Sequence, residues 1–414
     1  MELVERDEAL SRVAPGSQVL ANYCCGTPIT LLEGLARRAR DVPGIVLTAG
    51  LMLGDPPLDD VVRSGRLALR SWHIHGALRE LVREGLVDYL PLRLSDFAPA
   101  VLPDIDVVLV RVAPPDAEGW CNLGPSATFA PAAVAAVPLV IAEVDEAIPR
   151  TTGETRVRAT DIDVFVSSEH PMPEYRPAVP DAVSRSIAER VLELVPEGAT
   201  LQLGIGAIPE ALAPLLADRA GDSGWGLVGL VTEAMMPLVD AIAAAGRGPV
   251  VAIELMGGPA LMRWADGNSA LEMRGSGTLH DPRWLAGIPT LISINSAVAV
   301  DLKGQVVAES VAGHLLAGVG GSADFAEGAH LSPGGLRVIA LAATTARGES
   351  RIVAAHDPRD AITGPHHSVD VVVTEHGVAW LRGRTRSERA DALRAIAAPE
   401  HRTVLADPDD RRTT

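Results

Sequence analysis

Apolar and polar positions alternate along this chain in blocks. Continuous runs of Val, Ile and Leu occupy residues 44–48, 107–110, 139–142, 250–253, 291–294, 338–341 and 369–373. Between these runs lie segments with a helical pattern, including residues 77–84, 183–194 and 387–397. Strands that are apolar throughout and separated by helices are typical of parallel sheets covered on both faces. The pattern therefore predicts an α/β fold built on open, mostly parallel sheets.

A Pro-rich, polar segment from His170 to Asp181 interrupts the alternation. Pro and short polar residues break regular elements, so this segment is the best candidate for a linker. We expect an N-terminal α/β domain over residues 1–180 and a C-terminal α/β domain over residues 181–414.

The two halves resemble each other in sequence. Gly16-Ser-Gln-Val-Leu has a counterpart in Gly198-Ala-Thr-Leu-Gln, and Leu47-Thr-Ala-Gly50 has one in Val231-Thr-Glu-Ala234. This correspondence predicts two similar, pseudo-duplicated domains packed together. The first half has Ala49 where the second has Glu233, so the chemistry is expected in the C-terminal domain.

Composition narrows the class of protein. With 414 residues, 47% hydrophobic and 21% charged, the chain is long enough for two domains and is typical of a globular protein. No apolar run reaches the roughly 18 residues of a membrane span, and the N-terminus is acidic rather than signal-like. The net charge of −17 disfavours nucleic acid and anionic membranes as partners.

Cysteine and lysine usage adds two constraints. Cys24, Cys25 and Cys121 are too few for a disulfide scaffold in so long a chain, which favours reduced core residues and a cytoplasmic location. Lys303 is the single lysine, and it lies in a polar turn. Schiff-base chemistry and a P-loop lysine are therefore disfavoured.

Two segments carry the chemistry. Leu201-Gln-Leu-Gly-Ile-Gly-Ala-Ile-Pro209 is typical of a buried strand that ends in a glycine-rich turn and opens a helix at Pro209. Backbone N–H groups in such a turn point at an anionic group. Glu233 ends another apolar run, at the strand end where open α/β sheets keep their sites. A carboxylate without a His or Cys partner, beside N–H donors, indicates a nucleophilic glutamate with an oxyanion hole.

Several longer motifs follow one another in a fixed order. They are Pro114-Pro-Asp-Ala-Glu-Gly119 with Leu123-Gly124, Pro149-Arg-Thr-Thr-Gly153, Gln202 to Pro209, Thr232-Glu233, Ile294-Asn-Ser-Ala297 with Val300-Asp301, Gly318-Val-Gly-Gly-Ser-Ala-Asp-Phe325, and Val373-Thr-Glu-His-Gly-Val-Ala379 with Leu381-Arg-Gly383. In these motifs the chain resembles the acetyl-CoA hydrolase/transferase family, which includes 4-hydroxybutyrate and acetate CoA-transferases. The resemblance extends from about residue 13 to about residue 405.

The resemblance implies an enzyme that acts on acyl-CoA and short carboxylic acids, without a permanently bound cofactor, as a homodimer. It implies that Glu233 attacks the thioester and that Gly206, Ala207 and Ile208 supply oxyanion donors, with the Ile208 N–H as the main one. Gly318, Val319, Gly320 and Gly321 form the second expected donor segment, which also holds the pantetheine arm of coenzyme A.

Three functions are compatible with these motifs. The first is a CoA-transferase that forms an acyl-glutamyl anhydride and a glutamyl-CoA thioester on Glu233. If water reaches the same intermediates, the enzyme is an acyl-CoA hydrolase. The third is a non-catalytic CoA-binding relative. Many relatives have His, Met and Ser-Asp-Gly around the Thr-Glu motif, where this chain has Val231, Ala234 and Pro237. These departures leave the identity of the acid open.

Several other polar residues are candidates for the site. Glu375, His376 and Gly377 end a clear strand and are candidates for the cleft, with a structural turn as the alternative. Gln202 and Asn295 are expected to hold loop backbones, and Arg150 either meets an anion or pairs on the surface. The pairs His73/His75 and His366/His367 lack the acidic and thiol neighbours of a metal site. No metal is expected.

Overall fold

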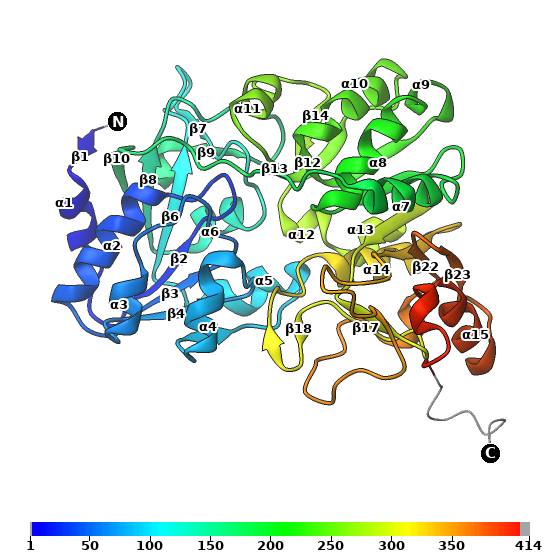
Figure 1. The fold of residues 1–414 in the computed structure, drawn as a ribbon. Coiled ribbons are helices and arrows are strands. Elements are labelled where there is room, and N and C mark those ends of the chain that lie inside the picture. Colours follow the sequence, from blue (N-terminus) through cyan, green and yellow to red (C-terminus); the bar gives the residue numbers. More distant parts are fainter. Residues whose placement is uncertain (1, 406–414) are drawn as a thin grey trace. The chain divides into compact units, whose positions relative to one another are not determined.

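The computed structural model describes residues 2–405 (Figure 1). Contacts within the chain define two compact units. Unit 1 comprises the residues up to Arg176 together with Leu230–Glu233 and Val251–His280. Unit 2 comprises Pro177–Gly229, Ala234–Val250 and the residues from Asp281 onward.

The first sheet has eight strands, and every neighbouring pair in it runs parallel. Its spatial order is β5 (Val87–Tyr89), β4 (Leu67–Ser71), β3 (Ile45–Ala49), β2 (Gln18–Ala21), β6 (Val107–Val112), β8 (Leu139–Val144), β10 (Val164–Ser167) and β1 (Leu3–Val4). The helices of this part of the chain are α1 (Arg6–Ser11), α2 (Ile29–Asp41), α3 (Asp59–Arg63), α4 (Arg79–Arg83), α5 (Leu94–Val101) and α6 (Ala130–Ala136).

The second sheet also has eight strands. Its order is β14 (Leu271–Met273), β13 (Val250–Met256), β12 (Gly226–Thr232), β11 (Thr200–Leu203), β15 (Leu291–Asn295), β20 (Leu336–Ala340), β22 (Val371–Thr374) and β23 (Gly377–Trp380). From β12 through β22 the neighbours pair in parallel, and β23 is antiparallel to β22.

The remaining helices are α7 (Ala182–Leu192), α8 (Ala207–Ala217), α9 (Ala220–Ser223), α10 (Met236–Ala244), α11 (Pro259–Ala265), α12 (Ser276–Leu279), α13 (Pro282–Ala286), α14 (Ser322–Leu331) and α15 (Arg386–Ile396). Short strands form small separate ladders: β7 (Trp120–Asn122) with β9 (Arg156–Arg158), β16 (Ala299–Asp301) with β17 (Val306–Val307) and β21 (Ile352–Val353), and β18 (Ser310–Val311) with β19 (His314–Leu315). No helix among the described residues is long and apolar enough to cross a bilayer.

The two large sheets have the same order in seven of their eight strands. From a central strand, β2 or β11, three strands follow on one side, and the chain then returns to add three more, beginning with β6 or β15, on the opposite side. The outermost strand on that side differs, because it is the first strand of the chain, β1, in one sheet and the last, antiparallel strand, β23, in the other. The strands matched by sequence, β2 with β11 and β3 with β12, take equivalent places in this order. The α/β fold with two pseudo-duplicated, mostly parallel sheets is therefore confirmed. In such sheets ligands bind where the strand order reverses, which here is between β2 and β6 and between β11 and β15.

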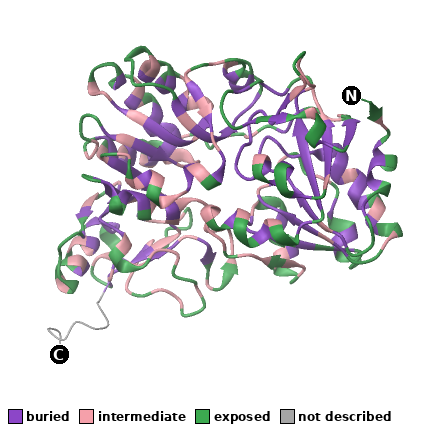
Figure 2. Ribbon diagram, turned by 180° about the vertical axis from the view of Figure 1, so that it is seen from behind, coloured by how far each residue is buried: buried purple, intermediate pink, exposed green. Residues whose placement is uncertain are grey.

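The apolar runs form these strands, and almost every residue in them is buried. All six residues of β6 are buried, as expected for a strand covered on both faces. Figure 2 shows the strands largely buried, while the helices expose their outer faces. In unit 1 four aromatic side chains, those of Tyr23, Trp72, Phe97 and Phe129, pack together, with the Trp72 ring centroid 4.5 Å from that of Phe97 and 5.6 Å from that of Tyr23.

Contacts divide the chain differently from the two contiguous domains expected at residue 180. The boundary after Arg176 falls inside the predicted linker, which contains no helix or strand from residue 171 to 181. However, residues 230–233 and 251–280 group with unit 1. The reason is backbone hydrogen bonding: Ala127 donates to Ile253 at 3.0 Å, and Glu154 donates to Met273 at 2.8 Å. Glu233 thus belongs to unit 1 and not to a contiguous C-terminal body.

Candidate active site

Glu233 follows β12 directly and starts a short 3-10 turn, Glu233–Met235, before α10. Its carboxylate is half-buried, and its Oε1 accepts a 2.9 Å hydrogen bond from the backbone N–H of Gly258. Val231, which replaces a His of many relatives, is completely buried in the strand. Therefore the side chain at position 231 packs in the core instead of lining an open site.

A glycine pair explains how the chain approaches Glu233 so closely. Gly257 and Gly258 follow β13 and precede α11. A Cβ on Gly257 would lie 3.0 Å from Glu233 Cγ and 2.8 Å from Leu261 Cδ2. A Cβ on Gly258 would lie 3.3 Å from Glu233 Oε1. A side chain at either position would press on the glutamate, so glycine is needed for close backbone approach.

The interdomain linker predicted from sequence is fixed to this glycine turn. Tyr175 donates its N–H to the Gly257 carbonyl at 3.2 Å, and the Cys25 thiol donates to the same oxygen at 3.5 Å. The neighbouring Glu174 is exposed, and its Oε2 lies 3.6 Å from where a Gly258 Cβ would be. Sequence reasoning missed these residues, although a strand followed by Gly-Gly-Pro repeats the strand–glycine–helix pattern seen before α8.

A second carboxyl group lies buried on β13, three residues before Gly257. Glu254 Oε1 accepts hydrogen bonds from Ser126 Oγ at 2.8 Å and Thr128 Oγ1 at 2.6 Å. Its Oε2 is buried without a hydrogen-bond partner. Burial, only partly offset by these hydrogen bonds, raises the pKa of Glu254 to about 8. Glu254 is therefore protonated at neutral pH.

Tyr23 and Cys24 belong to the same buried region. The Tyr23 hydroxyl shares a 2.8 Å hydrogen bond with Thr128 Oγ1. Burial and then the Glu254 carboxylate raise the pKa of Tyr23 and that of Cys24 well above their ordinary values. Cys24, Cys25 and Cys121 are all free and buried, as expected.

In unit 2 the predicted glycine turn connects β11 to α8. The helix begins at Ala207, two residues earlier than Pro209, and Gly206 precedes it with φ of 120°. L-residues rarely adopt this conformation. Ala207 and Ile208 lie in the first helical turn, where backbone N–H groups have no partner within the helix. The geometry suits the predicted donor role, which remains a prediction.

Side chains at the strand-order reversal of unit 2 form a network between β11 and β15. Asn295 Nδ2 donates to Gln202 Oε1 at 3.1 Å and to Ser293 Oγ at 2.8 Å. Ser293 Oγ also donates to Gln202 Oε1 at 3.0 Å. Gln202 and Asn295 thus have a structural role, but these hydrogen bonds join them to each other and to Ser293 and not to the loop backbones that were expected.

The second glycine segment leads into α14. Gly320 has φ of 57°, and a Cβ there would meet no atom within 4 Å. Ser322 Oγ donates to the Val319 carbonyl at 2.9 Å, which closes the turn. Because α14 precedes the parallel strand β20, its N-terminus lies at the sheet edge where β15 ends. Gly318–Gly321 and Gly206–Ile208 therefore lie at the same edge of the second sheet.

Glu375 and His376 form the turn between β22 and β23 at that edge, and Gly377 is the first residue of β23. Glu375 Oε2 accepts a 2.9 Å hydrogen bond from the N–H of Ala343, which follows β20. His376 Nε2 lies 3.7 Å from Glu375 Oε1. This turn is anchored to the neighbouring loop, and its predicted place in a cleft stays a prediction.

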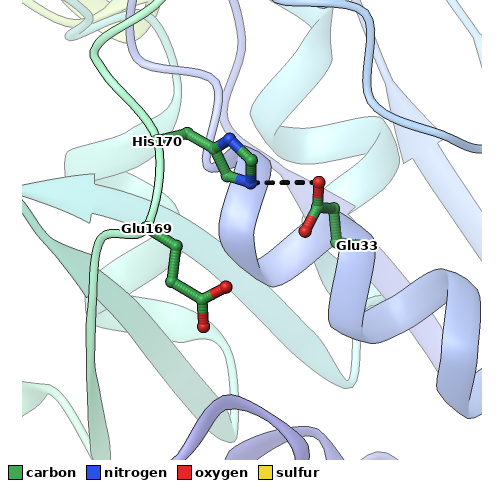
Figure 3. A group of neighbouring side chains, drawn as sticks. All are labelled: Glu33, Glu169 and His170. Carbon is green, nitrogen blue, oxygen red and sulfur yellow. Dashed lines mark ion pairs between the residues drawn. The ribbon is translucent and has the colours of Figure 1, made fainter.

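Unit 1 contains a cluster with ligand types that suit a metal, formed by Glu33, Glu169 and His170 (Figure 3). His170 Nε2 lies 3.0 Å from Glu33 Oε1. The Arg6 guanidinium lies 3.1 Å from Glu33 and 2.7 Å from Glu169. Arg6 already supplies the positive charge that these carboxylates require, so the cluster is interpreted as an ion-pair network.

The surroundings of His73, His75 and Arg150 indicate structural roles for these residues. Burial lowers the pKa of His73 and His75 to about 4, so both stay neutral. The Arg150 guanidinium donates to the Pro114 carbonyl at 2.8 Å, and its backbone N–H donates to Asp266 at 2.7 Å. Arg150 thus connects loops of unit 1 through its backbone and its side chain.

Comparison with known proteins gives a consistent result over the whole chain. Residues 1–173 match the acetyl-CoA hydrolase/transferase N-terminal domain, and residues 257–408 match the corresponding C-terminal domain. The 4-hydroxybutyrate coenzyme A transferase of Clostridium kluyveri is 33% identical, over 99% of this chain and 98% of its own. The butyryl-CoA:acetate CoA-transferase of Anaerostipes caccae is 31% identical, over 98% and 95%. The crystal structure of RipA from Yersinia pestis has a TM-score of 0.90 at 27% identity, covering 98% of this chain and 96% of that one.

Proposed function

Because this chain belongs to the acetyl-CoA hydrolase/transferase family, we propose that it transfers coenzyme A between an acyl-CoA and a carboxylic acid, with Glu233 as the nucleophile. The observation that carries this proposal is the half-buried carboxylate at the end of β12, held by the Gly258 N–H. A carboxylate needs no general base to attack a thioester. It needs a fixed orientation and limited contact with water.

The reaction begins with attack of the Glu233 carboxylate on the thioester carbonyl. The C–S bond breaks, and an acyl-glutamyl anhydride and a CoA thiolate form. The thiolate then attacks the glutamyl carbonyl, which releases the first acid as its carboxylate and leaves a glutamyl-CoA thioester. The incoming carboxylate attacks the carbonyl of that thioester, the CoA thiolate leaves, and a new acyl-glutamyl anhydride forms. The thiolate then attacks the acyl carbonyl of this anhydride, which forms the new acyl-CoA and releases the Glu233 carboxylate.

Two kinds of tetrahedral intermediate form along this path, and each needs N–H donors. When the glutamyl carbonyl is attacked, negative charge develops on an oxygen of Glu233 itself. The Gly258 N–H already donates to Oε1, so it is placed to stabilise that charge. For intermediates at the acyl carbonyl, the proposed donors are the N–H groups of Gly206–Ile208 and Gly318–Gly321.

The proposed substrates are short carboxylic acids and their CoA esters. Support comes from the names of the relatives, which act on 4-hydroxybutyrate, butyrate and acetate. Ala234 and Pro237 follow the nucleophile and are half-buried and exposed, respectively. Because they replace residues common in relatives next to Glu233, we propose that they alter which acid is accepted.

Location and assembly are part of the same proposal. Three free, buried cysteines support a reducing compartment, which is consistent with the cytoplasm. A homodimer is proposed from the family resemblance. Light scattering on the purified protein tests the assembly, and a monomer at working concentration would contradict it.

The function is tested by incubating the protein with a panel of short-chain acyl-CoAs, with and without candidate acids. The proposal predicts a new CoA ester that appears only when an acceptor acid is present. Release of free CoA at the same rate without any acid would identify a hydrolase instead. No turnover across the panel would favour a CoA-binding protein without catalysis.

A further inference from the structure

Unit 2 contains a cavity whose lining is almost entirely basic. The cavity has a volume of about 470 Å³ and is lined by Lys303, Gln305, His366, Arg384, Arg386 and Arg389. No carboxylate is among these residues. Such a basic lining is unexpected in this chain, which has a net charge of −17 and in which Lys303 is the single lysine. The volume is in the range of about 300–1,000 Å³ that small-molecule sites occupy.

The cavity lies at the edge of the second sheet where the strands begin. Asp370 immediately precedes β22 and binds Arg337 at the start of β20. Trp380, the last residue of β23, pairs with Val371, the first residue of β22, so the chain leaves this edge toward Arg384. The loops after β11 and β22 lie at the opposite edge, separated by about 13 Å for a four-residue strand. The cavity is therefore distinct from the glycine loops.

Arg389 gives the cavity a fixed frame. Its Nη1 donates to the carbonyls of Lys303 at 3.0 Å and His366 at 2.8 Å. A Cβ on Gly304 would lie 2.8 Å from this Nη1, and Gly304 has φ of 85°. Glycine at this position therefore lets the loop close over the guanidinium. Arg389 thus connects the first turn of α15 to the loops that contain Lys303 and His366.

Nearby acidic groups are engaged by other partners. Asp301 is buried and accepts the backbone N–H groups of Lys303 at 3.0 Å and Gln305 at 2.8 Å. Asp370 binds Arg337 and Arg382 outside the lining. Glu388 caps α15 through the Thr385 N–H at 2.8 Å and lies 3.7 Å from Arg384. None of these three carboxylates belongs to the described lining of the cavity.

A capping box fixes the start of α15, which carries Arg386 and Arg389. Thr385 and Glu388 satisfy each other's N–H groups at the start of α15. Partial burial lowers the pKa of Arg389, an effect that Asp370 opposes and Arg337 reinforces. A bound anion would relieve this cost.

We propose that this cavity binds a small molecule with two or more phosphate groups. Arginine forks pair with phosphate oxygens through two N–H groups, and the lysine ammonium adds a compact charge. Several basic groups around one hollow favour a polyphosphate over a single carboxylate. The phosphates could belong to coenzyme A or to a separate phosphorylated compound, and the experiment below distinguishes these sources.

The test is isothermal titration of the whole protein with inorganic pyrophosphate and with ADP at low salt. Saturable binding is expected, and the double variant Arg384→Ala/Arg386→Ala should weaken it at least tenfold. The matched control is Arg283→Ala/Arg359→Ala, which removes two exposed arginines of unit 2 that pair with Asp281 and Asp357. The control should bind like the wild type, and circular dichroism should confirm that both variants are folded.

Competition with coenzyme A identifies the source of the phosphates. If CoA displaces pyrophosphate and the Arg384→Ala/Arg386→Ala variant raises KM for acyl-CoA, the cavity holds phosphates of CoA. If CoA does not compete and KM is unchanged, the ligand is a separate phosphorylated compound. Absence of saturable binding, or equal weakening in the control variant, would overturn the proposal.

Discussion

The backbone N–H of Gly258 lies 2.9 Å from Oε1 of Glu233, and this contact fixes the proposed nucleophile. One oxygen of the carboxylate is held, so its plane is oriented before substrate arrives. The contact exists because Gly257 and Gly258 leave no side chain beside the glutamate. A correctly aimed donor of this type contributes about 3–4 kcal/mol to transition-state stabilisation.

Gly257→Ala should lower kcat without unfolding the protein. The added Cβ would lie 3.0 Å from Glu233 Cγ and 2.8 Å from Leu261 Cδ2, so the carboxylate must move away from the Gly258 N–H. We expect kcat to fall at least tenfold and Tm to change little. Gly277→Ala is the matched control in unit 1, since a Cβ there meets nothing within 4 Å. Equal kcat in the two variants would show that the turn does not position Glu233.

Replacement of Gly320 or Gly321 by Val should impair the second proposed donor loop. Gly320 has φ of 57°, which a β-branched residue tolerates poorly. A fall in kcat/KM of roughly a hundredfold is expected, the scale of one lost oxyanion donor. The loop is partly exposed, so the fold should survive. Unchanged kcat/KM in folded variants would remove this loop from the reacting centre.

Gly50→Val in the first half should act on stability instead of chemistry. Gly50 follows β3, the strand that matches β12, but its missing Cβ faces the Trp72 ring at 2.5 Å. Overpacking of this kind costs roughly 1–3 kcal/mol. Thermal unfolding should therefore begin at a lower temperature, while kcat of the folded fraction stays near the wild-type value. A well-folded variant that lost turnover would place Gly50 at the reacting centre.

Glu254 predicts a pH dependence of stability with a defined sign. The folded protein keeps the Glu254 proton up to about pH 8, whereas the unfolded chain releases it near the ordinary pKa of 4.5. Stability should therefore fall as pH rises from about 4.5 to about 8, by at most about 1.4 kcal/mol per pH unit, and then level off. Glu254→Gln removes this dependence because an amide does not titrate.

The measurement is urea unfolding of wild type and Glu254→Gln at pH 5, 6.5 and 8. The stability of the wild type relative to the variant should be greatest at pH 5 and smallest at pH 8. Parallel pH profiles in the two proteins would mean that Glu254 is ionised in the folded state at neutral pH.

The regular elements were predictable because their apolar runs are long and their separation is regular. Glu254 shows where this reasoning stops: the apolar run ends at Ile253, yet β13 continues to Met256 with a buried glutamate inside it. The buried carboxyl is accommodated by its raised pKa and by two hydroxyl donors from residues over a hundred positions away. Long-range pairing of this kind leaves no local signal.

The candidate site was predictable to a similar extent. Thr232-Glu233 and the Gly206 turn were recognised because each follows an apolar strand. The contact between Glu233 and Gly258 depends on which loop lies beside the end of β12, and this is set by the strand order β13–β12–β11. The grouping of residues 251–280 with unit 1 was not predictable either, because it rests on backbone hydrogen bonds between distant loops.

The covalent intermediate on Glu233 tests the central claim most directly. The protein is mixed with acyl-CoA, quenched with hydroxylamine or borohydride, digested and mapped by mass spectrometry, with Glu233→Ala treated in parallel. We predict one modified carboxyl, on Glu233, together with loss of activity, and no label in the folded Glu233→Ala variant. A label on another carboxylate, or full turnover in Glu233→Ala, would contradict the assignment of Glu233 as the nucleophile.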